Sequence, residues 1–305
     1  MADRVLAVDI GATKVAVALV DEKHQVTNKR EIPTTGNTRL WQDIEDVSHD
    51  LMDLAGGSLV GVGIGSAGPL HLQLGEVSPV NIPAWRNFPI VEKFKNLTQL
   101  ERVTLHGDAM ALAHAEYRLG AGRGCRNMLG MVVSTGVGGG LILNGQVFTG
   151  ESGNASYVGH HVIDFDGALC ACGRTGCVET YSSGPRMVAI ARARGWKGDA
   201  RDSFIELADS ARQGDSIARE AIDDGARALA IGIVNALAIL DIRTVVIGGG
   251  VSQAGPIYWD PLLRHFQREA RATNFITSCD LRLAQLDRDA GVIGAALGVL
   301  DLEVA

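Results

Sequence analysis

The sequence predicts an α/β protein with two lobes and duplicated halves. Its length of 305 residues exceeds what one hydrophobic core usually serves, so two lobes are expected. Hydrophobic residues make up 46% of the chain and 38 residues are glycine, a balance typical of compact α/β proteins. An apolar strand followed by a glycine-rich turn occurs near residue 9 and again near residue 134, and this recurrence indicates the duplication.

In the first half, alternation of apolar residues predicts strands, and apolar spacing of three and four predicts helices. The helical spacing is clear in Ile44, Val47, Leu51 and Leu54. The expected strands are 5–9, 15–19, 59–64 and one that ends near Leu105, and the expected helices are 44–54 and 108–117.

The second half repeats the strand and turn at 128–134, and Asn144-Gly145 is a strong hairpin signal after 141–143. Helices are expected from 185 to 240, strands at 244–247 and 281–284, and a last helix at 289–300 that returns to the first lobe. The expected domains are a small lobe, 1–117 with the C-terminal helix 289–305, and a large lobe, 118–288.

Net charge and apolar patterning limit which partners and which cellular compartment are expected. The formal net charge of −7 argues against a nucleic-acid partner, because such proteins usually carry a basic patch. Asp3 and Arg4 lead directly into a strand without the apolar region of a secretory signal. The longest apolar stretch, 226–240, is too short to span a bilayer. We therefore expect a cytoplasmic protein that binds neither nucleic acid nor membrane.

The first glycine-rich turn combines an acidic residue with phosphate-binding groups. Asp9 ends a strand, where its carboxylate can bind Mg²⁺, while Gly11 and Thr13 can bring backbone N–H groups and a hydroxyl to phosphate oxygens. Lys14 is a further candidate phosphate ligand. An ordinary hairpin with a satisfied acidic residue remains the alternative for this motif alone.

A second turn, 134–140, could hold the same polyphosphate. Gly136, Gly138 and Gly139 let the backbone approach a charged ligand, and Thr135 adds a hydroxyl. The alternative is that these glycines only permit a tight turn. After a later strand, Gly248, Gly249 and Gly250 could let an adenosine group lie against the backbone. Two phosphate loops in one chain indicate an ATP-dependent enzyme.

Asp108 follows a strand and begins a helix, so it is either a plain helix N-cap or a residue of a catalytic cleft. As a general base it would accept the proton of a sugar hydroxyl while that oxygen attacks the γ-phosphoryl group of ATP.

The strongest metal signal is His160 followed by Cys170, Cys172 and Cys177. Three thiolates and one imidazole suit tetrahedral Zn²⁺, and a closed set of four ligands predicts a structural site that holds the loop carrying Glu179. His161 is an alternative fourth ligand, and buried thiols without a metal are the alternative to the whole site.

These segments together resemble the ROK family of sugar kinases, which have the actin-like ATPase (ribonuclease H-like) fold, over nearly the whole chain. Residues 9–14 read D-I-G-A-T-K and resemble the family's D-I-G-G-T-K. Residues 134–140 resemble its second phosphate loop, and 159–160 with 170–179 resemble its G-H and zinc motif.

The resemblance implies ATP, Mg²⁺ and a structural Zn²⁺ as cofactors, a homodimer, and Asp108 as the base. The sugar-binding residues it implies are Gly68, Asn81, Asp108, Tyr157, His160 and Glu179. Three positions depart from the family pattern. Ala12 replaces a glycine of the first phosphate loop, Gly107 replaces the asparagine before the catalytic aspartate, and Tyr157 replaces a glutamate that binds sugar in many members.

The implied activity is phosphorylation of a hexose-type sugar at its 6-hydroxyl. N-acetylmannosamine kinases of the family can also lack the glutamate, and residues 133–140 and 172–179 look most like theirs, so N-acetylmannosamine is the preferred substrate and glucose the alternative. A transcriptional regulator of the same family would carry an N-terminal DNA-binding domain, for which the position of Asp9 leaves no room. A non-catalytic sugar sensor is the third alternative, because of Gly107 and Tyr157.

Overall fold

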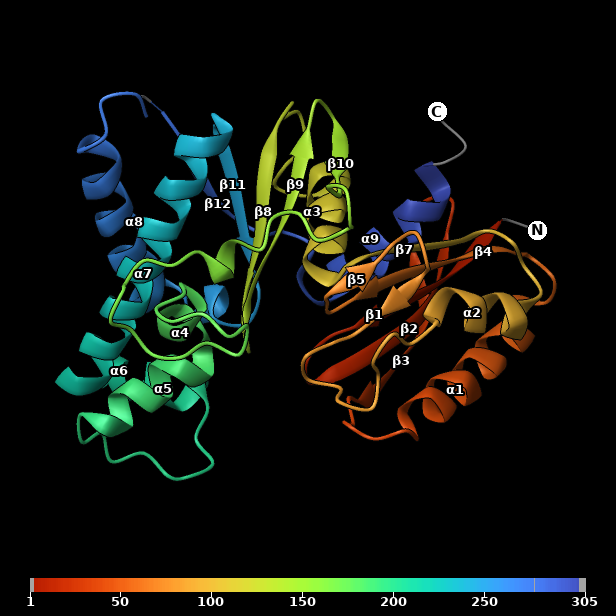
Figure 1. Cartoon of the computed structure of the whole chain (residues 1–305), viewed down its shortest axis with the longest axis horizontal. Coiled ribbons are helices and arrows are strands. Elements are labelled where there is room, and N and C mark those ends of the chain that lie inside the picture. The colour runs from red at the N-terminus through yellow and green to blue at the C-terminus, as the bar shows by residue number, and fades with distance from the viewer. Residues whose placement is uncertain (1–2, 277, 302–305) are drawn as a thin grey trace. The chain divides into compact units, whose positions relative to one another are not determined.

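A computed structural model describes residues 3–276 and 278–301 of the chain (Figure 1). The chain forms two compact units, the first made of residues 1–126, 140–156 and 285–305 and the second of 127–139 and 157–284. These units differ from the expected lobes, because residues 118–126, 140–156 and 285–288 all group with the first unit. Residues 1–2 and 302–305 of the expected small lobe lie outside the described residues.

The first unit is built on a five-stranded sheet with the order β3-β2-β1-β4-β7. Strands β1, β4 and β7 run parallel, while β2 pairs antiparallel with both β1 and β3. Their bounds are β1 Arg4–Ile10, β2 Lys14–Asp21, β3 Val26–Pro33, β4 Leu59–Ser66 and β7 Val103–Gly107. A small hairpin of β5 (Leu70–His71) and β6 (Glu76–Val77) follows β4.

The strict alternation of β1 sends its side chains to two different cores. Leu6, Val8 and Ile10 pack in the core that contains buried side chains of α1 (Leu40–Ala55) and α2 (Ile90–Thr98). Val5 and Ala7 pack with α9 (Ala290–Leu300), on the opposite side of the sheet. Asp9 shares the parity of Val5 and Ala7, so its carboxyl group lies on the α9 side.

Glycines let α9 lie directly on the sheet and on α3 (Asp108–Leu119). A Cβ on Gly63 of β4 would overlap the backbone of Ala295, and a Cβ on Gly294 would overlap the backbone of Ala111 in α3. Because neither position has room for a methyl group, the close approach of α9 depends on both glycines. This packing brings the first turn of α9 to the end of β1.

The second sheet repeats the topology of the first. Its order is β10-β9-β8-β11-β12, which matches β3-β2-β1-β4-β7 when each sheet is numbered from its own first strand. The bounds are β8 Met128–Val133, β9 Val137–Leu143, β10 Gln146–Phe148, β11 Thr244–Gly248 and β12 Asp280–Leu283. The expected duplication of the halves is therefore confirmed at the level of strand order.

Helices of the second unit follow the zinc motif and flank β11. They are α4 Glu179–Ser182, α5 Gly184–Ala193, α6 Phe204–Arg212, α7 Ser216–Leu240 and α8 Pro256–Arg271, with short 3₁₀ turns at Val158–His160 and Ser252–Ala254. Helix α6 begins at a capping box of Ser203 and Glu206, and the Asp215 side chain caps α7 by accepting from the Ala218 N–H. A further 3₁₀ turn, Asp287–Asp289, precedes α9 in the first unit.

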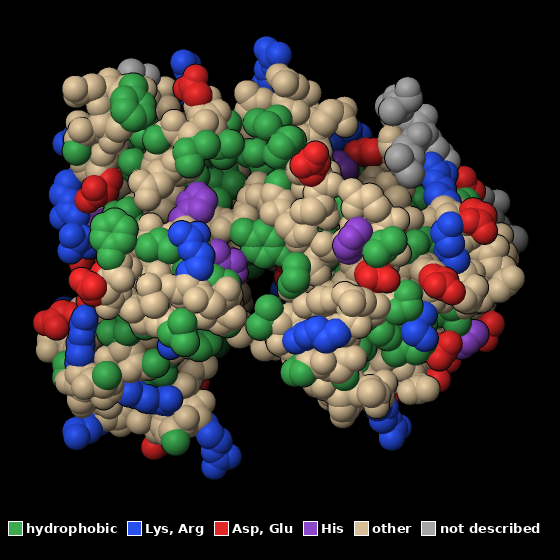
Figure 2. Space-filling view, in the orientation of Figure 1, with side chains coloured by type: hydrophobic (Ala, Val, Ile, Leu, Met, Phe, Trp, Pro, Cys, Tyr) green, Lys and Arg blue, Asp and Glu red, His purple; other side chains and the backbone are tan. Residues whose placement is uncertain are grey.

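Within residues 3–276 and 278–301, no helix has the length and apolar character that crossing a membrane requires. On the face shown in Figure 2, acidic and basic side chains are interspersed in small groups. The expectation of no nucleic-acid partner stays a prediction.

Glu116 is a fully buried acidic residue that joins two distant segments of the first unit. Its Oε1 accepts the backbone N–H groups of Gln285 and Leu286, at 2.8 and 2.7 Å, and its Oε2 accepts that of Ala121 at 2.8 Å. The residues just before α9 are thereby fixed to the end of α3.

Replacing Glu116 with alanine is expected to lower the free energy of unfolding by about 2–4 kcal/mol, because one buried and two part-buried N–H donors lose their acceptor. Glu116→Gln keeps the side-chain volume and one acceptor oxygen, so the free energy of unfolding is expected to fall by only about 1–2 kcal/mol. Urea unfolding of both variants checks this. Equal stability of Glu116→Ala and the wild type would contradict it.

Candidate active site and metal centre

Asp9 lies at the end of β1, beside the first turn of α9. A Cβ on Gly291 would overlap the Asp9 carboxyl group, so the glycine there leaves the space that this carboxyl occupies. Burial, and then the nearby charge of Asp108, raise the pKa of Asp9 to about 7. A carboxyl group in this position gains from a bound cation, which would favour its ionised form.

The turn after Asp9 is braced by the residue that follows β3. The Thr34 hydroxyl donates to the Gly11 carbonyl at 2.9 Å, and the Thr34 N–H donates to the Thr13 carbonyl at 3.0 Å. The Thr13 side chain is exposed. Lys14 pairs with Glu31 at 2.6 Å, so its ammonium is engaged by an acidic side chain in this structure.

Asp108 is the first residue of α3, at the end of β7. Its Oδ1 accepts the Ala109 N–H at 2.7 Å, which holds the carboxyl group at the helix start. Burial raises the pKa of Asp108, although the Ala109 N–H acts in the opposite direction. Gly107 occupies the N-cap position of α3 and Asp108 is the first residue of the helix, so Asp108 is not the plain helix N-cap of the alternative.

Gly65 of β4 separates Asp9 from Asp108. A Cβ on Gly65 would have Asp9 Oδ1 and the Cα of Asp108 as neighbours, each at 3.8 Å. The parallel strands β1, β4 and β7 end together, so their carboxyl ends collect these two acidic residues at one edge of the sheet. A carboxylate such as that of Asp9 can hold a divalent cation, and one such as that of Asp108 can accept a proton.

Two loops lie beside this edge within the first unit. Asn81 donates from Nδ2 to the Ala12 carbonyl at 3.2 Å, which connects the loop after β6 to the first glycine-rich turn. Gly68 is half-buried, its bond to Pro69 is cis, and the neighbouring Ala67 N–H donates to Ile10 at 2.9 Å. The structure thus brings Asp9, Asp108, Asn81 and Gly68 to the same part of the first unit.

In the second unit, the second glycine-rich turn lies beside the third glycine segment. The Ser134 N–H donates to the Gly136 carbonyl at 2.9 Å, and the exposed Thr135 is at the tip. Gly138 and Gly139 belong to β9 rather than to the turn. Gly249 has a φ of 92°, and a Cβ there would overlap the Val133 backbone, so only glycine lets this segment pass so close to β8.

The other two glycines of that segment flank Gly249. Gly248 ends β11, and a Cβ on Gly250 would lie 3.8 Å from the Ser134 hydroxyl. The proposed adenosine segment and the second phosphate turn are therefore neighbours.

Glu179 connects the zinc motif with the second glycine-rich turn. It begins α4, and its Oε2 accepts the Val137 N–H at 2.8 Å. A Cβ on Gly136 would lie 2.7 Å from the same oxygen, so glycine at position 136 makes this approach possible.

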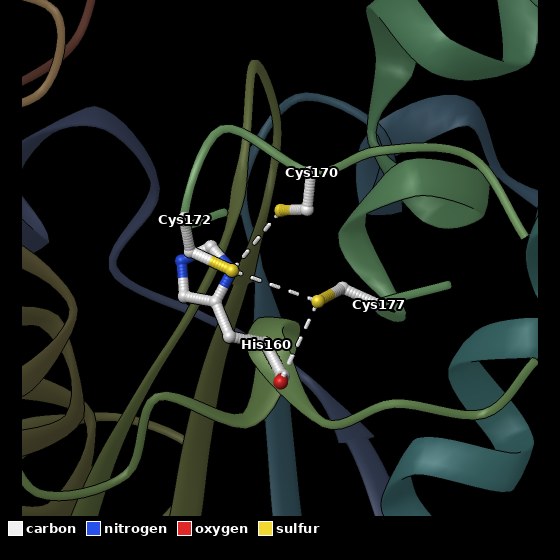
Figure 3. Close-up of side chains that lie close together, drawn as sticks. All are labelled: His160, Cys170, Cys172 and Cys177. Atoms are coloured by element: carbon white, nitrogen blue, oxygen red, sulfur yellow. Dashed lines mark hydrogen bonds between the residues drawn. The ribbon is translucent and has the colours of Figure 1, made fainter. Parts of the chain in front are cut away.

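The four expected zinc ligands lie together. His160, Cys170, Cys172 and Cys177 present ligand atoms that all lie within 4.8 Å of one another, and Figure 3 shows these side chains converging. Cys170 Sγ is 3.5 Å from His160 Nδ1, and Cys172 Sγ is 3.7 Å from Cys177 Sγ. Atoms bound to a tetrahedral zinc at about 2.0–2.3 Å lie about 3.3–3.8 Å apart, so the spacing fits zinc.

The electrostatics of the cluster also favour a cation. Burial and the neighbouring thiols raise the pKa of Cys177 to about 12, so several thiolates are unfavourable there without a compensating positive charge. The group formed by the described residues contains His160 and not His161, which decides between the two candidate ligands. Burial lowers the pKa of His161, the other candidate.

Tyr157 lies beside the cluster. Its ring stacks on His160 with centroids 5.8 Å apart and an interplanar angle of 22°, and the side chain is 38% exposed. The phenol therefore stands next to His160, an expected zinc ligand to which the family resemblance also gives a role in sugar binding.

Sequence reasoning missed two residues that shape the site around Asp9. Gly65 and Gly291 come from β4 and α9, and both border the Asp9 carboxyl group. Gly61, Gly63 and Gly65 alternate along β4, and this period of two was a usable signal that a helix packs closely on one face of that strand.

Comparison with known proteins agrees with this architecture. A family model described as ROK family matches residues 5–301. An N-acetylmannosamine kinase from Shigella flexneri is 36% identical over 294 residues, covering 96% of this chain and 97% of its own length. A glucokinase from Streptomyces coelicolor is 33% identical over 307 residues, covering 95% of this chain and 96% of its own length.

Solved structures lead to the same family. A ROK hexokinase from Thermus thermophilus superposes with a TM-score of 0.84 at 33% identity, covering 99% of this chain and all of its own. A ROK family glucokinase from Streptomyces griseus, in complex with glucose and AMPPNP, has a TM-score of 0.82 at 30% identity, covering 96% of this chain and 98% of its own. With the two matching sheets, the paired carboxyl groups and the zinc motif, these similarities establish that the chain belongs to the ROK family and has its actin-like ATPase fold.

Proposed function

We propose that this protein transfers the γ-phosphoryl group of ATP to the 6-hydroxyl of N-acetylmannosamine, with Asp108 as the general base. The chain is an ATP-dependent sugar kinase of the ROK family, and the proposal adds the sugar and the residue roles. The observation that carries it is the pair of acidic residues, Asp9 and Asp108, on either side of Gly65 where three parallel strands end.

In this proposal Asp108 removes the proton of the 6-hydroxyl as that oxygen forms its bond to the γ-phosphorus. The bond from this phosphorus to the β,γ-bridging oxygen breaks, ADP leaves, and the proton ends on Asp108. The raised pKa of Asp108 supports the role, because it improves a carboxylate as a proton acceptor.

Asp9 would hold Mg²⁺, which neutralises charge on the phosphates when bound. The proposed phosphate contacts come from the two glycine-rich turns, and the residues are Gly11, Thr13, Lys14, Thr135, Gly136, Gly138 and Gly139. Lys14 would exchange Glu31 for a phosphate. Gly248, Gly249 and Gly250 would adjoin the adenosine.

The proposed sugar contacts are Gly68, Asn81, Asp108, Tyr157, His160 and Glu179. Zn²⁺ at His160, Cys170, Cys172 and Cys177 would have a structural role and would hold His160 and the segment leading to Glu179. The homodimer implied by the family resemblance is part of the same proposal and is checked by light scattering.

Tyr157 supports N-acetylmannosamine over glucose. A phenol can bind or stack on a sugar but cannot form the charge-assisted hydrogen bond of the glutamate that the resemblance associates with this position in many relatives. The N-acetylmannosamine kinase from Shigella flexneri at 36% identity supports the same choice, while the glucokinases at 33% identity keep glucose as the second candidate.

A coupled assay with ATP, Mg²⁺ and a panel of sugars is expected to give the highest kcat/KM with N-acetylmannosamine. Tyr157→Glu is expected to raise the ratio of kcat/KM for glucose to kcat/KM for N-acetylmannosamine about tenfold. One charge-assisted hydrogen bond contributes about 1.5 kcal/mol or more.

Tyr157→Phe is the matched control, since it keeps the stacked ring and should leave the ratio within about twofold. A higher wild-type kcat/KM for glucose would contradict the substrate assignment. Sugar binding by calorimetry without any phosphoryl transfer would instead favour the non-catalytic sensor.

A further inference from the structure

The segment that carries Asn81 is a closed loop with its own small core. Val77 and Phe88 pair as an antiparallel bridge, with each N–H donating to the other carbonyl at 3.0 Å, and so close the loop 78–87 at its base. Ile82 and Trp85 are buried, and the Trp85 ring stacks on Phe88 at 4.2 Å with an interplanar angle of 2°. A loop closed and filled in this way has a defined shape.

Arg86 binds the carbonyl groups of that loop. Its Nη1 donates to the carbonyl oxygens of Pro79 and Trp85 at 2.8 Å each and to that of Ile82 at 3.2 Å. One guanidinium nitrogen has two hydrogens, so at least one of them is shared between two carbonyl groups. The acceptors lie on both sides of Asn81 in the sequence, so a single cation fixes the backbone that presents this residue.

Asn81 in turn contacts the first phosphate loop. Its Nδ2 donates to the Ala12 carbonyl at 3.2 Å, and this hydrogen bond sets the orientation of the amide plane. The chain of contacts therefore runs from Arg86, through the loop carbonyl groups, to Asn81 and then to the turn that follows Asp9.

The base of the loop is joined to the Gly68 turn as well. The Ser78 N–H donates to the Pro69 carbonyl at 2.9 Å, and the Ser78 hydroxyl accepts the Asn87 N–H at 2.9 Å. Neither hydrogen bond involves Arg86, so the base of the loop stays joined to the Gly68 turn when Arg86 is replaced.

We propose that Arg86 is a positioning residue for the sugar: by binding three carbonyl groups of the loop 78–87, it holds Asn81 against the first phosphate loop in the orientation that receives the substrate. This inference rests on the proposed function, because it takes Asn81 as a sugar ligand. Arg86 itself takes no part in the phosphoryl transfer.

The test compares Arg86→Ala, Asn81→Ala and the double variant in the full chain, with N-acetylmannosamine and glucose as probes. Arg86→Ala is expected to raise the KM of the phosphorylated sugar at least fivefold and its calorimetric Kd by the same factor, while the KM of ATP and kcat at saturating sugar stay within about twofold. Because Arg86 acts through Asn81, the double variant should be no worse than Asn81→Ala alone.

Two further variants separate positioning from general damage. Arg86→Lys keeps a cation that can donate to several carbonyl groups, so it should recover most of the sugar affinity. Arg30→Ala, at an exposed arginine of β3 that donates to the Lys29 carbonyl, should leave both sugar constants unchanged.

The outcomes are distinguishable. A wild type that neither binds nor phosphorylates either sugar would overturn the proposed function. A wild type that binds sugar, with Arg86→Ala binding it equally well, would overturn the role of Arg86. Multiplicative losses in the double variant, or an equal rise in the KM of ATP, would also overturn it, because the effect would then not pass through Asn81.

Discussion

Asp108→Asn is expected to lower kcat by about 10²–10⁴-fold, because an amide cannot take the proton of the 6-hydroxyl. The substitution keeps the shape of the side chain, and the amide oxygen can still accept the Ala109 N–H that holds Asp108 in place. Binding of an ATP analogue and of the sugar, measured by calorimetry, should therefore stay within a few-fold of the wild type.

The pH profile gives a second readout of Asp108. Burial raises its pKa above the ordinary value, so the wild type should lose kcat as the pH falls through that raised pKa, when the base becomes protonated. Asp108→Asn has no carboxyl group to titrate and should lack this decline. Asp53→Asn, at an exposed aspartate of α1, is the control and should match the wild type. A kcat near that of the wild type for Asp108→Asn would remove Asp108 as the base.

Cys177→Ser is expected to reduce bound zinc from about one equivalent to a small fraction and to destabilise the protein by about 3 kcal/mol or more, because the buried thiol is one of four converging ligands. For a protein of this size, such a loss corresponds to a fall in Tm of about 6–12 °C. Elemental analysis and thermal unfolding measure the two effects.

The kinetic consequence should fall on the sugar more than on ATP. Glu179 lies two residues after Cys177, and its carboxyl group accepts the Val137 N–H. Loss of order in the segment 170–179 would therefore displace a proposed sugar ligand. Cys279→Ser changes a half-buried cysteine outside the cluster and should retain zinc. Purified wild-type protein that contains no zinc would refute the metal assignment.

Much of the fold could be predicted because its central strands have strong local patterns. Strands β1, β2, β8 and β11 are nearly continuous apolar runs between glycine-rich turns, which is typical of strands buried on both faces. Helix α1 was clear from apolar spacing, whereas α5, α6 and α7 were expected only as helices within residues 185–240.

One edge strand and two helices were missed from the sequence. Strand β3 lies at the edge of its sheet and exposes most of its polar side chains, so it has no apolar alternation. Helix α8 was also missed, although its buried residues Tyr258, Leu262 and His265 recur at spacings of four and three. The short helix α2 was overlooked as well.

The sequence by itself determined the family, the duplicated α/β architecture and the three cysteines of the expected zinc site, because each depends on residue types at short spacing. Only the tertiary structure decided that Gly65 and Gly291 shape the surroundings of Asp9, that His160 rather than His161 joins the cysteines, and that Arg86 supports Asn81. The physical reason is that close backbone approach and shared hydrogen bonds join segments far apart in the chain, and their residue types carry no local pattern that identifies the partner.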